Sequence, residues 1–161
     1  MSPQSPPLVF DRSRLRRRRN RAALSFADYA FLKSRVSSDL AERLADTSRR
    51  FHLALDLGAH GRELAAALRA SRQVDTGIAL ESASERLREA ETSVCADEEV
   101  LPFKDTAFDL VGSALALHWV NDLPGAMVQV RRALKPDGLF LGALFGAGTL
   151  SELRTCLIEA E

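Results

Sequence analysis

Glycines and carboxylates follow three apolar runs of this sequence. Residues 56–62 read DLGAHGR, Glu81 follows the run TGIAL, and residues 97–99 read DEE. Carboxylate oxygens accept hydrogen bonds from hydroxyl and amino groups, and a glycine, which has no Cβ, lets a ligand approach the backbone. These three stretches are therefore the first places to expect a binding site for a polar organic ligand.

The first stretch places Gly58 and Gly61 just ahead of a predicted helix. The free N–H groups at the start of such a helix can donate to a ligand. A tight turn between a strand and a helix explains the two glycines equally well. This stretch therefore indicates a ligand only in combination with the others.

Glu81 follows Gly58 by 23 positions. A carboxylate at about this separation can accept hydrogen bonds from the ribose hydroxyls of an adenosine. The alternative is a surface glutamate in the first turn of a helix, where its charge is favourable. Asp75 competes for the same role, but it precedes the apolar run and so belongs at the opposite edge of a sheet.

The acidic stretch offers Asp97 and Glu98 for the other end of the same ligand. A carboxylate there can accept from the amino group of an adenine, and Val100 and Leu101 can pack on its ring. A solvated acidic loop is the alternative. Because all three stretches are expected at one edge of one sheet, their coincidence favours an adenosine-type ligand.

The residues around the glycines distinguish between ligands. A pyrophosphate site needs Gly-x-Gly-x-x-Gly, whereas His60 and Arg62 fill positions where that loop has small residues. Asp56, two residues before Gly58, adds negative charge that repels a pyrophosphate and suits an ammonium group. S-adenosylmethionine carries an ammonium group and no phosphate, so the charge favours it over NAD.

His118 is the candidate catalytic residue. It lies in the loop 116–123 and is suited to proton transfer near neutral pH, and Trp119 beside it could wall a pocket. The alternative is that both residues simply pack this loop onto the sheet. Methyl transfer to a reactive nucleophile needs mainly alignment of methyl, sulfur and acceptor, so a dedicated base is not required.

Five short apolar runs alternate with helical patterns along the chain. This alternation predicts right-handed βαβ units and a parallel sheet with helices on both faces, which is an α/β Rossmann-like architecture. Ligands of such sheets bind beyond the carboxyl ends of the strands, where the strand order reverses, and the first strand is expected there. The expected strands are 53–57, 76–80, 93–96, 108–113 and 139–144, and the expected helices are 28–50, 62–70, 82–91, 123–134 and a last one from 149 or 151 onward.

Two local signals refine these elements. Ser82, with Glu85 three residues on, predicts a capping box at the start of the third helix. Residues 135–138, KPDG, predict a helix stop and a turn before the last strand.

The composition excludes several classes of protein. The chain has 161 residues, of which 46% are apolar and 27% are charged, as in one ordinary globular domain. Basic and acidic residues number 22 each, so no bulk field attracts nucleic acid. Two cysteines exclude a disulfide scaffold and a cysteine-rich zinc module, and no metal site is expected. No apolar run approaches the roughly 20 residues of a membrane span.

The balance of charge nevertheless differs along the chain. Residues 1–50 contain 12 basic and 5 acidic residues, and the excess is concentrated in the arginine run 12–21. Such a run occurs in nucleic-acid arms and targeting peptides, but here no aromatic residues alternate with the arginines and no apolar segment follows them. We therefore favour a solvated, partly helical arm, or one that leans on the acidic body of its own chain. Residues 1–8 are expected to be a disordered lead.

Longer stretches resemble a known family. ALDLGAHG, ADEEVLPFKDTAFDLV, LALHWVNDLPGAMVQVRRALKPDG and FLGALFGAGTLSELR together resemble class I S-adenosylmethionine-dependent methyltransferases. More narrowly, they are similar to the mitochondrial complex I assembly factors of methyltransferase fold and their alphaproteobacterial relatives. The opening VFDRSRLRRRRNRAA is similar to the start of that family, which implies that the arginine run belongs to the domain.

The resemblance implies roles for the residues singled out above. Asp56, Gly58 and Gly61 would line the methionine side of S-adenosyl-L-methionine, Glu81 would hold the ribose, and Asp97 with Glu98 would hold the adenine. His60 and Arg62 depart from the glycine-rich pattern of the family and are expected to crowd the cofactor. The relatives also continue beyond Glu161 with two more strands. We therefore expect residues 9–161 to form a single, C-terminally incomplete domain with about five strands.

The leading functional expectation is an enzyme that modifies a protein in respiratory complex I assembly, by methyl transfer or arginine hydroxylation. One alternative is an O-methyltransferase of a carrier-bound or small acid, as in the biotin pathway. Another is a non-catalytic assembly module. The expected partner is a complex I subunit rather than nucleic acid, and the expected location is the bacterial cytoplasm, without a signal peptide. The sequence contains no signal for an oligomeric state.

Overall fold

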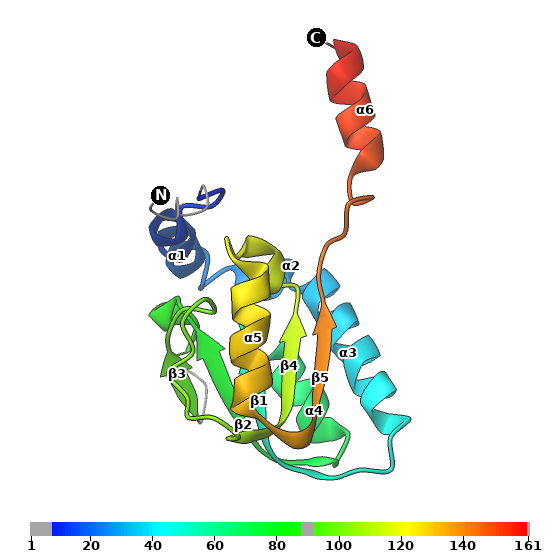
Figure 1. Cartoon of the computed structure of the whole chain (residues 1–161). Coiled ribbons are helices and arrows are strands. Elements are labelled where there is room, and N and C mark those ends of the chain that lie inside the picture. The colour runs from blue at the N-terminus through cyan, green and yellow to red at the C-terminus, as the bar shows by residue number, and fades with distance from the viewer. Residues whose placement is uncertain (1–7, 88–91, 161) are drawn as a thin grey trace.

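A parallel five-stranded sheet forms the centre of the computed structural model (Figure 1). The structure describes residues 8–87 and 92–160. Every neighbouring pair of strands is parallel, which confirms the predicted α/β class. The order across the sheet is β3-β2-β1-β4-β5, and the strands are β1 (Phe51–Leu57), β2 (Val74–Glu81), β3 (Ser93–Cys95), β4 (Phe108–Ala114) and β5 (Leu134–Ala143).

The first strand lies where the strand order reverses. Leu55 of β1 is opposite Ile78 of β2 on one side and Val111 of β4 on the other. Because all strands are parallel, their carboxyl ends share one edge, at which α/β sheets bind ligands. We call this edge the rim; it comprises residues 58–61, 81–83, 97–99 and 114–119.

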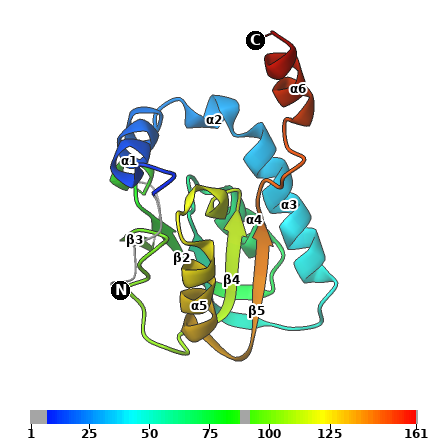
Figure 2. The same cartoon turned by 45° about the horizontal axis from the view of Figure 1, so that its top comes forward.

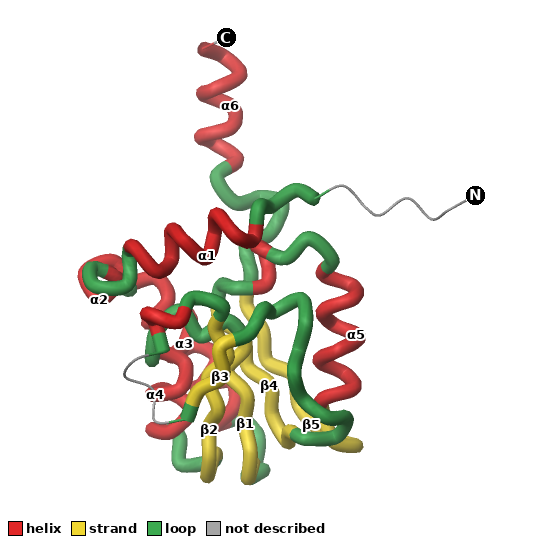
Figure 3. The backbone as a smooth tube through the Cα atoms, turned by 90° about the vertical axis from the view of Figure 1, so that its left-hand side faces the viewer, coloured by secondary structure: helices red, strands yellow, loops and turns green. Residues whose placement is uncertain are grey.

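Helices cover both faces of the sheet (Figures 1 and 3). On one face, α3 (Phe31–Ala45) and α4 (Glu63–Ala70) bury Leu44 and Leu64 against the strands. On the other face, α5 (Leu123–Ala133) buries Val130. The apolar runs of the strands are therefore covered on both sides, as parallel sheets require.

Two helices of the N-terminal segment lie over the rim. Figure 2 shows α1 (Arg12–Arg21) and α2 (Phe26–Tyr29) beyond the carboxyl ends of the strands, before the chain enters α3. Two short 3₁₀ turns, η1 (Ser84–Arg86) and η2 (Leu117–Trp119), lie at the same end of the sheet. The arginine run is therefore an ordered part of the fold, as the family resemblance implied.

The last helix, α6 (Ser151–Ala160), extends away from the sheet (Figures 1 and 3). Every residue of α6 is exposed, including Leu153, Leu157 and Ile158. None of the helices in the described residues is both long and apolar enough to cross a membrane.

The helix expected over residues 28–50 is shorter and is preceded by a break. Tyr29 ends α2, Phe31 begins α3, and α3 ends at Ala45. The expected helix over 82–91 is also wrong in its first turn, where the chain forms only η1. Its later part, residues 88–91, lies outside the described residues, as do residues 1–7 of the expected lead. The Ser82 hydroxyl donates to the Glu81 carboxylate at 3.0 Å instead of capping a helix, so polar contacts at the rim override the local capping signal.

The turn predicted at residues 135–138 falls inside the limits of β5. The register changes from Phe108 opposite Leu134 to Leu110 opposite Leu139, so β5 carries extra residues there. Asp137 adopts a φ of +62°, as a turn requires. The turn chemistry is correct, but the strand resumes pairing across it as a bulge.

Candidate functional site

The turn after β1 requires a glycine at position 58. Gly58 has a φ of +72°, and a Cβ there would lie 2.3 Å from the Cβ of Ala116 in the loop after β4. The N–H groups of Gly58 and Ala59 both donate to the carbonyl of Leu80 at 2.9 Å. This glycine therefore lets the ends of β1, β2 and β4 approach one another.

His60 and Gly61, later in the same loop, differ from Gly58. A Cβ at Gly61 would meet only the movable carboxylate of Glu63, at 2.5 Å, and the φ of Gly61 lies outside the left-handed region. His60 has a φ of +52°, and its backbone N–H donates to Oε2 of Glu81 at 3.0 Å. The rim thus tolerates a histidine where the family pattern has glycine, because Glu81 satisfies its backbone.

Glu81 is fully buried at the end of β2. Its Oε1 accepts from the Ser82 hydroxyl at 3.0 Å, the Ala83 N–H at 2.9 Å and Nη1 of Arg19 at 3.0 Å. Burial of a carboxylate costs several kcal/mol unless charge and hydrogen bonds compensate it. Arg19 supplies that charge from α1.

The acidic stretch after β3 meets the same helix. Glu98 is fully buried and accepts from Nη1 of Arg19 at 2.7 Å and from Nη2 of Arg12. Asp97 accepts from Nη2 of Arg12 at 2.7 Å and from its Nε at 3.3 Å. Burial acts to raise the pKa of Asp97, but hydrogen bonds from Arg12 and the Glu99 N–H outweigh it, and the pKa lies below its ordinary value.

The sequence analysis did not single out these two arginines. Arg12 and Arg19 are seven positions apart, or about two helical turns, so they lie on one face of α1. Leu15 between them is half-buried, whereas Arg16, Arg17 and Arg18 are exposed. The interpretation that the arm leans on the acidic body of its own chain is confirmed. The face that does so could have been found from the i, i+3, i+7 spacing of Arg12, Leu15 and Arg19.

A lysine that the sequence analysis missed occupies the switch point itself. Lys33 of α3 is buried, and its Nζ donates to the carbonyls of Gly58 at 3.2 Å and Ala114 at 2.9 Å. Burial lowers the pKa of Lys33, although the Asp56 charge opposes this effect. The sequence signal that could have revealed this lysine is its spacing, because Lys33 lies on the same face of the helix as the buried residues Ser37 and Leu40. The ends of β1 and β4 are thus built to hold an ammonium group.

Asp56 lies just inside the rim, on the face of the sheet that α4 covers. Both carboxylate oxygens are buried without a hydrogen-bond partner among the residues that the structure describes. Burial raises the pKa of Asp56 to about 6, and the charge of Lys33 acts in the opposite direction. Asp56 therefore contributes negative charge near the ammonium position but makes no hydrogen bond to Lys33 in the structure.

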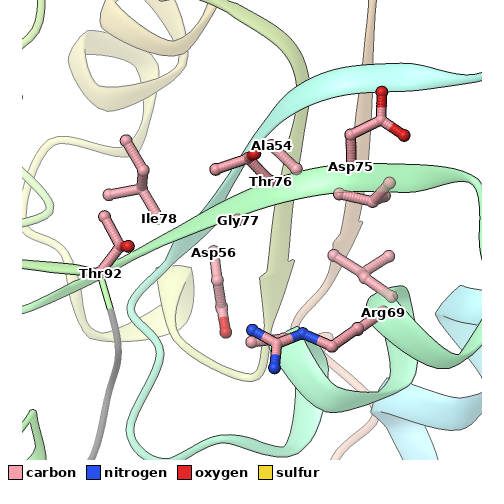
Figure 4. Close-up of a pocket in the computed structure, with 11 residues that line it drawn as sticks. Ala54, Asp56, Arg69, Asp75, Thr76, Gly77, Ile78 and Thr92 are labelled. Carbon is pink, nitrogen blue, oxygen red and sulfur yellow. The ribbon is translucent and has the colours of Figure 1, made fainter.

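A cavity of about 200 Å³ lies between Asp56 and α4 (Figure 4). Its lining includes Arg69 of α4 and the side of β2 from Val74 to Ile78. Asp56 is the one predicted site residue in its lining, whereas Gly58, Glu81 and Asp97 are not part of it. The other predicted residues lie along the rim.

His118 and Trp119 form the wall after β4. The His118 ring packs 4.6 Å from the Phe145 ring and 5.3 Å from that of Trp119, and Trp119 packs 5.4 Å from Phe10. Burial and the charge of Arg19 lower the pKa of His118, so its imidazole is neutral near pH 7. Nδ1 of His118 is buried without a partner in the described part of the chain. A neutral ring can accept a proton, while the packing interpretation accounts for its ring contacts equally well.

One group of side chains at the rim has the geometry of metal ligands. His60, Glu81 and Glu98 each offer an atom, and these atoms lie within 4.8 Å of one another. Burial and the charges of Lys33 and Arg19 hold the pKa of His60 well below its ordinary value, which leaves its ring neutral. However, Arg19 already pairs with both carboxylates and Arg12 pairs with Glu98, so a divalent cation would have to replace these arginines.

The rim therefore brings together most of the residues that the sequence analysis selected. A Cβ on Gly58 would lie 3.3 Å from Oε1 of Glu98, and His60 links the glycine turn to Glu81. Of the two apolar residues expected to pack on an adenine, Leu101 contacts the core and Val100 is exposed. The rim therefore offers mainly hydrogen-bond acceptors. The carbonyls of Gly58 and Ala114 accept from Lys33, and the carboxylates accept from Arg12 or Arg19.

The chain is similar to known proteins of one family. Residues 55–142, more than half of the chain, match the model of the methyltransferase domain family. The arginine-hydroxylase NDUFAF5 of mitochondria from Danio rerio is 45% identical over 95% of this chain and 50% of its own length, and the Homo sapiens protein is 44% identical. The malonyl-[acyl-carrier protein] O-methyltransferase of Xylella fastidiosa (strain M23) is 34% identical over 95% of this chain and 55% of its own. The chain thus spans about half the length of the curated relatives it matches.

Solved structures support the fold. A crystal structure from Methanococcus maripaludis, provisionally described as an S-adenosyl-L-methionine-dependent methyltransferase, superposes with a TM-score of 0.66. The superposition covers 88% of this chain and 69% of that one at 20% identity. Its sheet and helices, and the family match across β1 to β5, agree with the architecture described above. The chain belongs to the methyltransferase domain family.

Proposed function

We propose that this chain binds S-adenosyl-L-methionine at the rim and modifies a protein substrate. The observation that supports this proposal is the set of acceptors at the switch point. The carbonyls of Gly58 and Ala114 accept hydrogen bonds from the ammonium group of Lys33, and the Glu81 and Asp97 carboxylates belong to the same rim. An ammonium, two ribose hydroxyls and an adenine amino group are the donors of S-adenosyl-L-methionine, so its chemistry fits these residues.

The proposed roles follow from position. Gly58, Gly61 and Asp56 line the methionine side, Glu81 accepts from the ribose, and Asp97 with Glu98 accepts from the adenine. When bound, S-adenosyl-L-methionine supplies an activated methyl group. The chain contributes alignment and exclusion of water, which account for much of the catalysis of such transfers. We also propose that residues 9–161 act as a single binding domain.

Neutral His118 is the proposed proton acceptor. Its ring lies at the wall after β4, where an acceptor group of the substrate would enter. Burial lowers its pKa, so the ring is neutral at pH 7 and has a nitrogen free to accept a proton. For an arginine or other nitrogen nucleophile, this role makes the nucleophile available without requiring a second base.

The substrate class is proposed from the relatives. The proteins that are 44–45% identical over 95% of this chain are named arginine-hydroxylases, so we propose an arginine side chain on a subunit of respiratory complex I as the acceptor. A carrier-bound malonyl group is the second candidate, because the O-methyltransferase of Xylella fastidiosa matches the same 95% at lower identity.

Calorimetric titration of the purified chain with S-adenosyl-L-methionine, and separately with NAD, tests the binding site. We expect micromolar binding of the first and none of the second, and loss of binding in Gly58→Ala. Binding of NAD instead would contradict the proposal. Mass spectrometry of isolated complex I subunits incubated with the chain then separates an added methyl group from an added oxygen. Methylation of a malonyl carrier protein in a parallel assay would instead support the second candidate.

A further inference from the structure

One face of α1 lies directly on the proposed nucleoside site. Figure 3 shows α1 running across the rim above β2 and β3. Arg12 and Arg19 point from it toward the acidic residues, while Arg14, Arg16 and Arg17 are exposed. The helix therefore presents two of its cations to the site and the rest to solvent.

These two arginines engage every carboxylate proposed to bind the nucleoside. Arg19, which is 6% exposed, bonds Glu81 and Glu98 through one nitrogen, and Arg12 bonds Asp97 and Glu98. Oε1 of Glu81 accepts three hydrogen bonds in this arrangement, so a ribose hydroxyl that binds this oxygen would have to replace one of them. Nη2 of Arg19 is buried without a partner among the described residues, so this arginine is held less completely than its burial demands.

The contacts that hold α1 are mainly polar. Arg19 is the one residue of α1 that is buried. Hydrogen bonds hold the end of the helix to η1: the Glu85 N–H donates to Oδ1 of Asn20 at 3.1 Å, and Nε of Arg86 donates to the Arg19 carbonyl at 3.2 Å. Release of α1 would expose little apolar surface. When α1 is released, the rim carboxylates lose its hydrogen bonds and ion pairs. A ligand that carries donors and positive charge can replace them.

We propose that α1 is a strap that closes the rim and competes with the cofactor: Arg19 and Arg12 occupy the acceptors of the ribose and the adenine, and α1 must move off them before the cofactor binds. This inference rests on the proposed function. It also accounts for the cluster of His60, Glu81 and Glu98, whose two carboxylates are paired with Arg19 and Arg12 in the closed form.

Trypsin cleavage of the unmodified chain tests the strap, because α1 contains many arginines. We expect saturating S-adenosyl-L-methionine to accelerate cleavage within residues 12–21 several-fold, read by mass spectrometry of the fragments. Slower or unchanged cleavage, together with calorimetric binding, would overturn the strap and leave the proposed function standing. It would mean that the cofactor binds with α1 in place. If neither the chain nor its variants bind S-adenosyl-L-methionine, the proposed function fails and the strap fails with it.

Arg12→Gln is the variant with which to measure the competition. Arg12 is partly exposed and Arg19 still pairs with Glu98, so this variant keeps a cation at the buried carboxylates. We expect the dissociation constant for S-adenosyl-L-methionine to fall about five- to tenfold, because the variant loses the charge-assisted contacts of Arg12 with Asp97 and Glu98. The matched control is Arg17→Gln, which removes the same charge from the exposed face of α1 and should change the constant less than twofold. Equal constants for the chain, Arg12→Gln and Arg17→Gln would refute the competition.

Discussion

The β3 side of the sheet and the segment beyond β5 differ in which residues they bury. Around β1, β2 and β3, charged groups are buried and paired, as in the contacts of Arg19 with Glu81 and Glu98. Beyond β5, the apolar residues Leu153 and Leu157 of α6 are exposed. Buried charge is tolerated only where a partner is fixed opposite it, whereas exposed leucines cost little in stability. Changes at the rim should therefore have large effects, and changes in α6 small ones.

The largest effect is expected for Arg19→Ala. This change leaves Glu81 buried without its arginine partner and Glu98 paired with Arg12 alone, and breaking such a buried pair costs about 3–5 kcal/mol. Urea unfolding followed by circular dichroism measures the loss. The control, Arg18→Ala, removes an exposed arginine one position away and should cost less than about 0.5 kcal/mol. Similar losses for both variants would show that the rim carboxylates are not buried as described.

Asp56→Asn should change how stability depends on pH. The pKa of Asp56 is raised by burial to about 6 in the folded chain, against 3.8 for the unfolded group, so its stabilising contribution is present below pH 4 and lost as the pH rises through 6. The wild-type free energy of unfolding should therefore fall by about 3 kcal/mol relative to that of Asp56→Asn between these limits. Denaturant titrations at pH 4 and 7.5 measure the difference.

The control is Asp28→Asn, at an exposed position, which should change this pH-dependent difference in the free energy of unfolding by less than about 0.5 kcal/mol. A wild-type chain that gains stability on this scale as the pH rises would contradict the burial of Asp56.

Gly58→Ala should destabilise the fold by about 2 kcal/mol, because an alanine at φ +72° is strained and its Cβ would collide with Ala116. Gly77→Ala is the matched control within β2, since a Cβ there meets nothing within 4 Å. This second change should stabilise the chain by about 0.5 kcal/mol. Thermal unfolding of the two variants side by side tests the pair, and destabilisation of equal size would mean that the turn after β1 is not special.

The smallest effect is expected in α6. Leu157→Ala should change the free energy of unfolding by less than about 0.5 kcal/mol, because the side chain is 60% exposed. The same substitution at Leu44, which is fully buried on α3, should cost about 2–5 kcal/mol. A cost at Leu157 that approaches that at Leu44 would indicate that α6 is packed in solution, and the contrast between the two ends of the sheet would disappear.

Much of the fold could be predicted because its signals are local. Apolar runs such as 53–57 and the glycine turn that follows mark strands and their ends, and alternation with helices predicts a parallel sheet. The helix break near Tyr29 and the bulge at residues 135–138 were not predicted. They arise because the chain must pass over the rim in the first case and β5 must keep pairing with β4 in the second.

The sequence by itself determined the α/β order and indicated that Gly58, Glu81, Asp97 and Glu98 belong to one edge, because strand direction and periodicity are properties of consecutive residues. Only the tertiary structure decided which cations meet them. The partners of Lys33 and the carboxylate partners of Arg12 and Arg19 lie 25 to 86 positions away in the sequence. The structure pairs these three cations, among the many basic residues, with buried acceptors, because burial makes an unpaired charge too costly.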